Sequence, residues 1–425
     1  MTINNEHKKL NFSSEREQSQ ACLNSAEHEK NQGRKVLNVP NLRFKEFQGE
    51  WENCRLGNLC NVLMCKRILA SQTNTEEGIP FYKIGTIGNA PDAYISKELF
   101  DDYKTKYNYP HKGEVMITCA GTVGKCVIYD GKDAYYQDSN IVWIDNPSQC
   151  ISNSFLYHLL AKVDWRKLNS TTIIRIYNDD LRNLKLSYPQ IEEQQKISRL
   201  LSLLDERIAT QNKIIEDLKM LKSAIIENVF DDKHSERLQL DNVGSYIRGL
   251  TYSSNNVVEH GGTLVMRSNN IVNGSLLDYN NNVVYVNKQM SAEQQLQNGD
   301  IVICMANGSS SLVGKSSFYD GNCHSPITVG AFCGIYRSKE PIVKWLFQTN
   351  KYRRYIWNSL QGGNGAIANL NGEDILNMSF SIPNAPIKDT CVKMLTSVDS
   401  ALENNMSLCA LYTLQKQHLL RQMFI

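Results

Sequence analysis

The sequence lacks several features that would place the protein in a particular class. No stretch of about 18 consecutive apolar residues occurs, which argues against a membrane-spanning helix. The first residues contain no apolar core of a secretory signal, so we expect a cytoplasmic protein. The 12 cysteines are scattered without a C-x-x-C pair, which favours reduced thiols over disulfides or a zinc site. The formal net charge of +2 neither indicates nor excludes a nucleic-acid partner, because basic side chains can gather on one face.

Motifs of common catalytic and cofactor sites are also missing. G-x-S-x-G, H-E-x-x-H and G-x-G-x-x-G do not occur, and the eight histidines are dispersed. Residues 307–316 resemble a phosphate-binding P-loop, but Gly308 and Gly314 are separated by one residue too many. A Gly/Ser-rich hairpin loop that carries a lysine is the better interpretation. We therefore expect no catalytic residue, no metal and no cofactor in this chain.

The longest helical pattern covers residues 189–230, in which no Pro or Gly occurs after Pro189. Glu192 and Glu193 stand in its first turn, where the helix dipole favours acidic side chains. From Ile197 to Val229, apolar residues recur at alternating steps of four and three. This spacing predicts a heptad seam, which requires a partner helix.

The partner helix is predicted in residues 383–424, at a constant offset of 194 from the first pattern. Even the polar interruptions of the seam coincide, since Gln211 corresponds to Asn405 and Lys222 corresponds to Lys416. Chance rarely preserves both a heptad and its interruptions over such a length. We therefore infer an internal duplication.

The rest of the sequence falls into two matching segments. Residues 36–188 contain short β-branched and aromatic runs separated by Gly, Asn and Asp, and residues 231–382 repeat them at offsets of 184 to 194. Residues 1–35 are polar and lack sustained periodicity, which predicts a disordered or weakly helical tail. The predicted fold is α+β, with two tandem pseudo-symmetric α/β domains (36–188 and 231–382) separated by long helices over 189–230 and 383–425.

Polar and basic side chains stand in the predicted loops of both segments. Arg, Lys, Asn and Gln pair with base edges in the major groove, and Lys, Thr and Ser reach phosphates. Taken alone, such residues are more often solvated loop positions, but the duplication makes DNA reading a serious hypothesis. The candidates in the first segment are Lys83, Thr86, Thr122, Lys125, Tyr135, Gln137, Asn140 and Arg175. Those in the second segment are Arg267, Asn269, Asn270, Asn307, Ser309, Lys315, His324 and Ser325.

The pattern over roughly residues 36–425 resembles the specificity (S) subunit of type I restriction–modification systems. The resemblance is carried by Leu42-Arg-Phe-Lys-Glu-Phe, Trp51, Leu56-Gly, Ile79-Pro-Phe-Tyr-Lys-Ile, Gly121-Thr-Val-Gly-Lys and, most specifically, Tyr188-Pro-Gln-Ile-Glu-Glu-Gln-Gln-Lys-Ile with Leu204-Asp. The second copy departs from this pattern, because residues 383–389 lack the Glu-Glu-Gln while Val398-Asp remains. The partner contacts at the two ends are therefore not expected to be equal.

The resemblance implies that each segment is a target recognition domain that reads one half of a split DNA site. Two antiparallel helices would separate the domains, and about 39 helical residues at roughly 1.5 Å each span roughly 58 Å, or about 17 base pairs. The chain itself would not be catalytic. Two methyltransferase (M) subunits would bind it and bring S-adenosylmethionine, while restriction (R) subunits would join the complex and bring ATP and Mg²⁺. Such systems are found in the bacterial or archaeal cytosol.

An antiparallel pairing would bring Gln211 and Asn405 together near the middle of the helices, where we predict a buried polar layer that fixes the register. Two other hypotheses stay open at this stage. The chain could be a coiled-coil scaffold whose domains bind proteins rather than DNA, or dispersed nuclease residues could make it an enzyme by itself.

Overall fold

The computed structural model describes residues 37–138, 140–168, 174–231, 236–361 and 368–425. The predicted tail over residues 1–35 lies outside the described residues. Within the described ranges, no helix is both long and apolar enough to cross a membrane. No disulfide joins the cysteines of this part of the chain.

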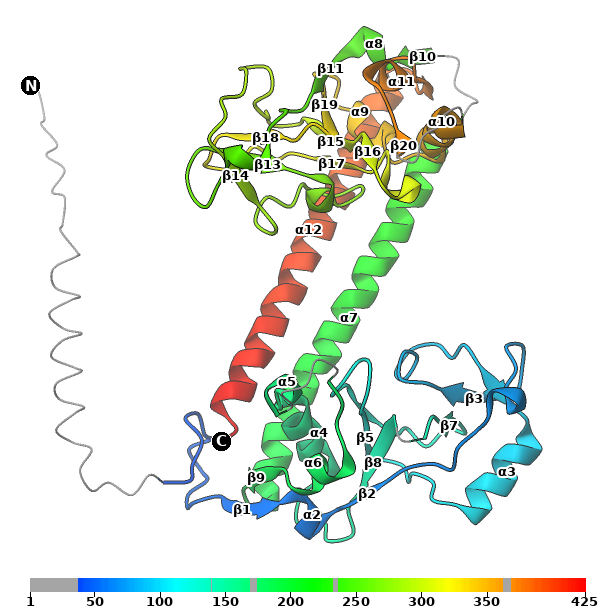
Figure 1. Cartoon of the computed structure of the whole chain (residues 1–425), viewed down its shortest axis with the longest axis vertical. Helices are drawn as coiled ribbons and strands as arrows, with labels where there is room; N and C mark the ends of the chain where they lie inside the picture. The colour runs from blue at the N-terminus through cyan, green and yellow to red at the C-terminus, as the bar shows by residue number, and fades with distance from the viewer. Residues whose placement is uncertain (1–36, 139, 169–173, 232–235, 362–367) are drawn as a thin grey trace, which may run out of the picture. The chain divides into compact units, whose positions relative to one another are not determined.

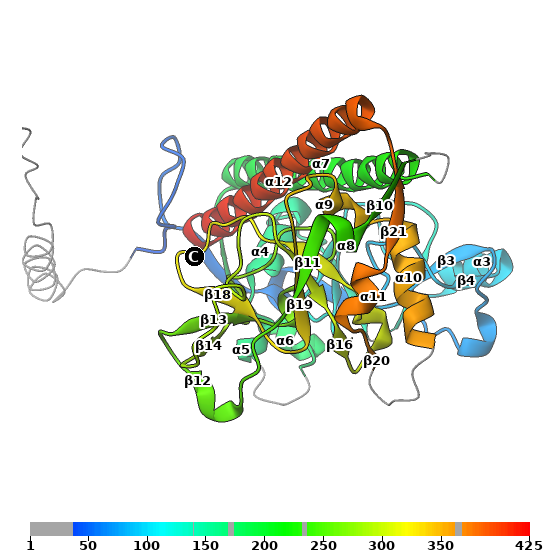
Figure 2. The same cartoon turned by 90° about the horizontal axis from the view of Figure 1, so that it is seen from above.

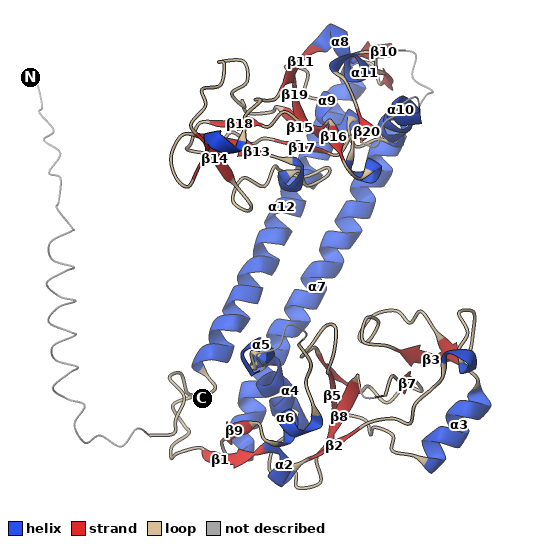
Figure 3. Cartoon of the chain, viewed as in Figure 1, coloured by secondary structure: helices blue, strands red, loops and turns tan. Residues whose placement is uncertain are grey.

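The chain divides into two compact units. The first unit comprises the described residues up to Arg207 together with Tyr412–Ile425, and the second unit comprises Ile208–Leu411. Helices and strands occur together in each unit (Figure 3), so the mixed α/β character expected from the sequence is confirmed.

The described residues of the first unit form three small sheets. Its strands are β1 (Glu52–Arg55), β2 (Asn61–Leu63), β3 (Ile79–Tyr82), β4 (Tyr94–Ile95), β5 (Val115–Thr118), β6 (Cys126–Ile128), β7 (Tyr135–Tyr136), β8 (Ile141–Asp145) and β9 (Lys185–Tyr188). Its short helices are α2 (Leu56–Leu59), α3 (Lys97–Lys106), α4 (Asn153–Lys162), α5 (Trp165–Leu168) and α6 (Asn178–Arg182). The strand orders are β2-β8-β5-β6, β4-β3-β7 and β1-β9, and only the β3–β7 pairing is parallel among these strands.

The central sheet of the first unit is buried on both faces, because successive side chains of a strand point to opposite sides. Val115 and Ile117 of β5 pack into the cluster that contains α4. Met116, between them, packs into the cluster that contains β3 and α3. This explains why β5 and β8 read as continuous apolar runs rather than as alternating ones.

The second unit also combines short strands and helices. Its strands are β10 (Glu236–Gln239), β11 (Gly244–Arg248), β12 (Val257–Val258), β13 (Thr263–Met266), β14 (Val284–Val286), β15 (Ile301–Cys304), β16 (Ala306–Asn307), β17 (Ser316–Phe318), β18 (Ile327–Val329), β19 (Cys333–Ser338), β20 (Ala368–Asn369) and β21 (Ser379–Ile382). Its short helices are α8 (Leu240–Val243), α9 (Val343–Leu346), α10 (Asn350–Gln361) and α11 (Gly372–Leu376). The strand orders are β11-β19-β15-β17, β12-β14-β13-β18, β10-β21 and β16-β20. Helix α11 lies beside β11 (Figures 1 and 2), where a Cβ on Gly372 would stand 2.4 Å from the Tyr246 ring.

Both predicted long helices are present, as α7 (Ile191–Val229, 39 residues) and α12 (Ala385–Gln422, 38 residues), and each contributes to both units (Figure 1). They run antiparallel within each unit. In the second unit Gln211 donates a hydrogen bond to Asn405, and Lys222 pairs with Asp399 at 2.7 Å. In the first unit Lys416 pairs with Asp205. The role of Gln211 and Asn405 in fixing the register stays a prediction, although the two side chains do meet.

The Glu-Glu-Gln motif anchors the start of α7 to the first unit. Glu193 is 1% exposed and accepts two hydrogen bonds from Arg43, at 2.8 and 2.7 Å. The buried Gln194 donates to the carbonyl oxygens of Cys150 and Pro189, both at 2.8 Å, and accepts from the Ser152 amide. The motif therefore fixes the direction in which α7 leaves the sheet that precedes it.

Candidate nucleic-acid interface

In the first unit, three segments meet at the carboxyl ends of the parallel strands β3 and β7. The turn between β5 and β6 contributes Thr122, whose hydroxyl donates to the Ile84 carbonyl at 3.0 Å. Lys125 donates to the Ile87 carbonyl at 2.5 Å. Gln137, which follows β7, accepts a hydrogen bond from the Ile84 amide at 3.4 Å. The sequence candidates from these segments thus come together, which their separation along the chain did not reveal.

The turn between β5 and β6 requires glycine for two reasons. Gly121 and Gly124 have φ values of +63° and +83°, a region that disfavours side chains. In addition, a Cβ on Gly124 would lie 2.2 Å from Cδ1 of Trp165, the first residue of α5. The turn therefore packs tightly against α5, and this contact positions Thr122 and Lys125.

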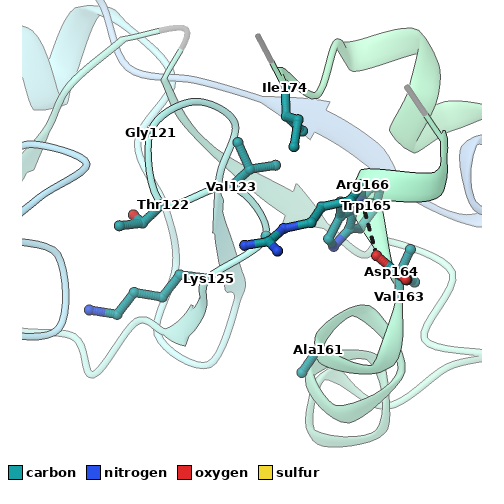
Figure 4. A pocket seen from close by; sticks show the side chains of 11 residues that line it. Gly121, Thr122, Val123, Lys125, Ala161, Val163, Asp164, Trp165, Arg166 and Ile174 are labelled. Carbon is teal, nitrogen blue, oxygen red and sulfur yellow. Dashed lines mark hydrogen bonds between the residues drawn. The ribbon is translucent and has the colours of Figure 1, made fainter. Parts of the chain in front are cut away.

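A pocket of about 510 Å³ lies between this turn and α5 (Figure 4). Its polar lining consists of Thr122, the basic Lys125 and Arg166, and the acidic Asp164, so positive charge exceeds negative charge. Arg166 is exposed, and its side chain extends from α5 toward the turn (Figure 4). The sequence analysis missed Arg166, although a Trp-Arg-Lys run directly after a predicted helix could have drawn attention to it. The pocket offers hydrogen-bond donors and positive charge, which suit a phosphate or a base edge.

Thiol nucleophiles do not belong to this site. Burial raises the pKa of the Cys119 thiol to about 12, although nearby Arg175 acts in the opposite direction. Burial likewise raises the pKa of Cys126 to about 12. Both thiols are therefore neutral near pH 7 and unreactive. The chemistry that the loops offer is recognition by hydrogen bonds and charge.

The second unit has a loop cluster of its own. Asn307, at the end of β16, donates to the Ser268 hydroxyl at 3.2 Å and accepts from the Ser309 amide at 3.0 Å, which joins the segment after β13 to β16 and the loop that follows it. The Phe332 carbonyl accepts hydrogen bonds from the amides of Met305 and Ala306, at 2.9 and 3.1 Å. The Phe332 side chain is 70% exposed on this well-anchored backbone. Sequence analysis missed it, because a single phenylalanine carries no local signal of exposure.

The remaining candidates differ in what they present to solvent. Arg267 and Asn269 are exposed in the loop after β13, and Arg267 donates to the Asn282 carbonyl at 3.3 Å. Lys315 is half-buried at the end of the loop that precedes β17. Lys83 pairs with Asp92 at 3.1 Å, and the Thr86 hydroxyl is engaged with the Lys83 backbone. Asn140 and Arg175 are half-buried near the β5–β6 turn, and the Asn140 carbonyl accepts from the Cys119 amide at 2.8 Å.

The structure corrects two of the predicted DNA contacts. Tyr135 is fully buried in the core around β3 and β7, so its ring cannot reach a ligand. Asn270 is 1% exposed, and its amide is used within the loop, where it donates to the carbonyls of Asp278 and Asn281 and accepts from the Arg267 amide. In addition, His324 and Ser325 precede β18 and lie at its amino end. The structure does not bring them to the loop cluster, which stands at the carboxyl ends of β13 and β18.

Comparison with known proteins relates this arrangement to one family. The family model described as "Type I restriction modification DNA specificity domain" matches residues 48–220. Residues 48–220 are thus similar to this specificity domain. The resemblance inferred from the sequence is thus confirmed, and the matched residues of the specificity domain include the first loop cluster and most of α7.

Several similar proteins are named as type I restriction enzyme specificity subunits. The chain is 49% identical over 165 residues to a type I restriction enzyme specificity subunit of Haemophilus influenzae, which covers 39% of this chain and 42% of that protein. It is 35% identical over 155 residues to the EcoKI specificity subunit of Escherichia coli, covering 34% and 31%. The matches span about half or less of the length of these curated relatives. The crystal structure of a type I restriction–modification S subunit from M. genitalium shares the fold, with a TM-score of 0.59 and 15% identity over 91% of this chain and 99% of that one.

Proposed function

We propose that this chain is the non-catalytic DNA-recognition subunit of a type I restriction–modification complex. In this proposal each unit reads one half of a bipartite site through its loop cluster. The observation that carries the proposal is that both units present basic and amide side chains at the carboxyl ends of one parallel strand pair, β3–β7 in the first and β13–β18 in the second. Arg, Lys, Asn and Gln are the side chains that read base edges.

The equivalence of the two loop clusters supports two tandem pseudo-symmetric recognition domains, 36–188 and 231–382. The pairing β1–β9 is matched by β10–β21, and the order β2-β8-β5-β6 is matched by β11-β19-β15-β17. The Cys119 amide donates to the Asn140 carbonyl, just as the Met305 amide donates to the Phe332 carbonyl. Phe332 therefore occupies the position of Asn140. The different side chains at this position fit two half-sites of different sequence.

The long helices support the second part of the proposal. We propose that α7 and α12 set the distance between the half-sites and carry the docking sites of two methyltransferase subunits. Met220 and Leu221 are adjacent apolar side chains of α7 that are 64% and 50% exposed, and contiguous exposed apolar surface suits a protein partner. S-adenosylmethionine would then be held by the methyltransferase subunits, and ATP and Mg²⁺ by restriction subunits that the complex recruits.

A selection experiment tests this function. The chain, with its methyltransferase subunit, is incubated with random duplexes, and the retained DNA is sequenced. We expect two short motifs at a fixed gap, and an affinity whose logarithm falls linearly with the logarithm of the salt concentration. A single continuous motif, or no enrichment, would refute the proposal. The pure chain, incubated with DNA, Mg²⁺, ATP and S-adenosylmethionine, should show no turnover.

A second candidate function is a scaffold that binds proteins instead of DNA. The exposed apolar side chains on α7 favour it, because they suit protein partners. The affinity for DNA duplexes and its dependence on salt concentration distinguish the two functions. A scaffold would be retained on its partner in the absence of DNA and would show no affinity for any duplex.

A further inference from the structure

Asp399 of α12 is the centre of a buried ionic cluster in the second unit. Its carboxylate accepts from Lys222 of α7 at 2.7 Å and from Lys344 of α9 at 2.8 Å. The indole of Trp345, also in α9, donates to it at 3.2 Å. The side chains of Lys222 and Asp399 are 9% and 7% exposed. One carboxylate thus holds two ammonium groups and an indole from two other helices.

The same cluster reaches the loops of the recognition domain. Lys222 also donates to the Gly274 carbonyl at 3.0 Å, and the Gly274 amide donates to the Ser316 carbonyl at 2.9 Å, at the start of β17. The Lys344 ammonium stands 3.8 Å from the centroid of the Phe318 ring, at the end of the same strand. The cluster therefore connects the helix pair with α9 and with the central sheet of the second unit.

The first unit repeats only part of this arrangement. Asp205 and Lys416 stand at the offset of 194 from Asp399 and Lys222 and form the equivalent ion pair. The residues of α4 beside this pair are Tyr157, whose ring lies 5.9 Å from the Lys416 ammonium, and the neutral His158, whose imidazole lies 3.4 Å from the Ser202 hydroxyl. Burial, followed by the charge of Lys416, lowers the pKa of His158 to about 4. An aromatic ring and an imidazole thus stand where the second unit has Lys344 and Trp345.

Ionic hydrogen bonds restrict geometry more than apolar packing does. Apolar contacts are non-directional, whereas charge-assisted hydrogen bonds are short and depend on orientation. An orientation that moves α9 away from Asp399 would remove one of its two ammonium partners and leave the buried Trp345 indole without its acceptor, so that orientation is disfavoured. Buried polar groups are also the best-attested means of fixing a helix register.

We propose that Asp399 is a specificity-determining positioning residue. By holding Lys222 and Lys344 together, it fixes the orientation of the second recognition domain on the helix pair, and with it the gap between the two half-sites. This inference rests on the proposed function. The preference for one gap length between the half-sites then depends on a contact that does not involve DNA.

The test uses Lys344→Met in the full chain, because Lys344 is the most exposed member of the three charges, at 28%, and its loss leaves the Lys222–Asp399 pair intact. Duplexes that carry the two motifs selected by the wild-type chain are prepared with gaps one base pair shorter and longer. The ratio of the affinity for the correct gap to the affinity for the altered gaps should fall about fivefold or more. This is the size of effect expected when the coupling between neighbouring residues is lost. Lys344→Arg, which keeps the charge, should restore most of the preference. Lys339→Met, at an exposed lysine of the same unit, is the matched control for loss of a positive charge.

Hydrogen exchange supplies a readout that needs no DNA. Lys344→Met should speed the exchange of amides in α9 and leave those of α7 and α12 near Asp399 unchanged. The inference would be overturned if Lys344→Met left either the gap preference or the amide exchange of α9 unaltered. The proposed function would still hold in that case, provided that the wild-type chain selects two motifs. If the wild-type chain selected no pair of motifs, the proposed function itself would fail.

Discussion

The contact between Gln211 and Asn405 allows a quantitative prediction about the helix pair. Gln211 is 9% exposed and donates to the Asn405 side chain, whose amide in turn donates to the Ala401 carbonyl at 2.6 Å. Replacing Gln211 alone by Leu removes the donor and leaves the Asn405 oxygen without it, at a cost of about 1–3 kcal/mol. Burial of the leucine offsets much of that cost, since a fully buried leucine contributes about 1.5–3 kcal/mol.

Replacing both residues by Leu should have the opposite outcome. Both polar groups disappear, about 1 kcal/mol of net hydrogen-bond energy is lost, and one buried and one half-buried leucine are gained. We therefore expect the double variant to stabilise the helix pair by about 1–3 kcal/mol. The register should loosen at the same time, because leucines tolerate sliding that paired amides do not. Duplexes of varied gap should then bind with more similar affinities.

The assay is a double-mutant cycle read by hydrogen exchange of α7 amides near residue 211, because a chain of two units need not unfold in a single two-state step. Asn404→Leu, at an exposed neighbouring position of α12, controls for the added apolar surface. The reasoning is refuted if the effects of the two single changes add up to that of the double change within about 0.5 kcal/mol.

Three further predictions concern the first unit. Gly124→Ala should destabilise it by about 2–4 kcal/mol, because the new Cβ meets Trp165 and the left-handed backbone is strained; in thermal unfolding, Gly299→Ala, with φ of +89° and open space, should show only the smaller backbone cost. His158 has a folded pKa of about 4, below the usual 6.5, so the unfolded state binds the additional proton and stability should fall by up to about 3 kcal/mol as the pH drops from about 6.5 to about 4. Urea titrations across this range should show that His158→Phe abolishes the loss, and an unchanged pH dependence would contradict the assignment. Arg166→Gln should weaken binding to all duplexes alike and reduce the slope of log affinity against log salt by about 1, and a sequence-selective loss would argue against a phosphate contact.

The sequence predicted those elements that a local pattern determines. The heptad seam gave both long helices to within about two residues at either end, within the usual uncertainty of helix boundaries, and the apolar runs gave β5 and β8. The contact of Gln211 with Asn405 was also predictable, because an antiparallel pairing of equal helices brings their middles together.

Side-chain exposure was not predictable from the same patterns. Tyr135 belongs to a strand of two residues, too short for an alternation that would mark its buried side. Asn270 was chosen as a residue type that reads bases, but a short amide also satisfies the backbone of a turn, and that use prevails here. Lys222 was taken as an interruption of the seam, because its partner Asp399 lies 177 residues away and only the tertiary structure brings them together.

The discontinuous first unit has a consequence for the order of folding during synthesis. Its core includes Met423 and Phe424, with the Phe424 ring stacked on Phe155 at 4.9 Å, and the Leu42 amide donates to the Gln422 carbonyl at 2.8 Å. The second unit, in contrast, is one uninterrupted segment. On the ribosome, therefore, the part of the chain made first cannot complete its core until residues 412–425 emerge, whereas the later part can close before it. Until then the apolar surface around Trp51 and Phe155 stays uncovered, and chaperones that bind such surfaces should act on the nascent first unit rather than on the second.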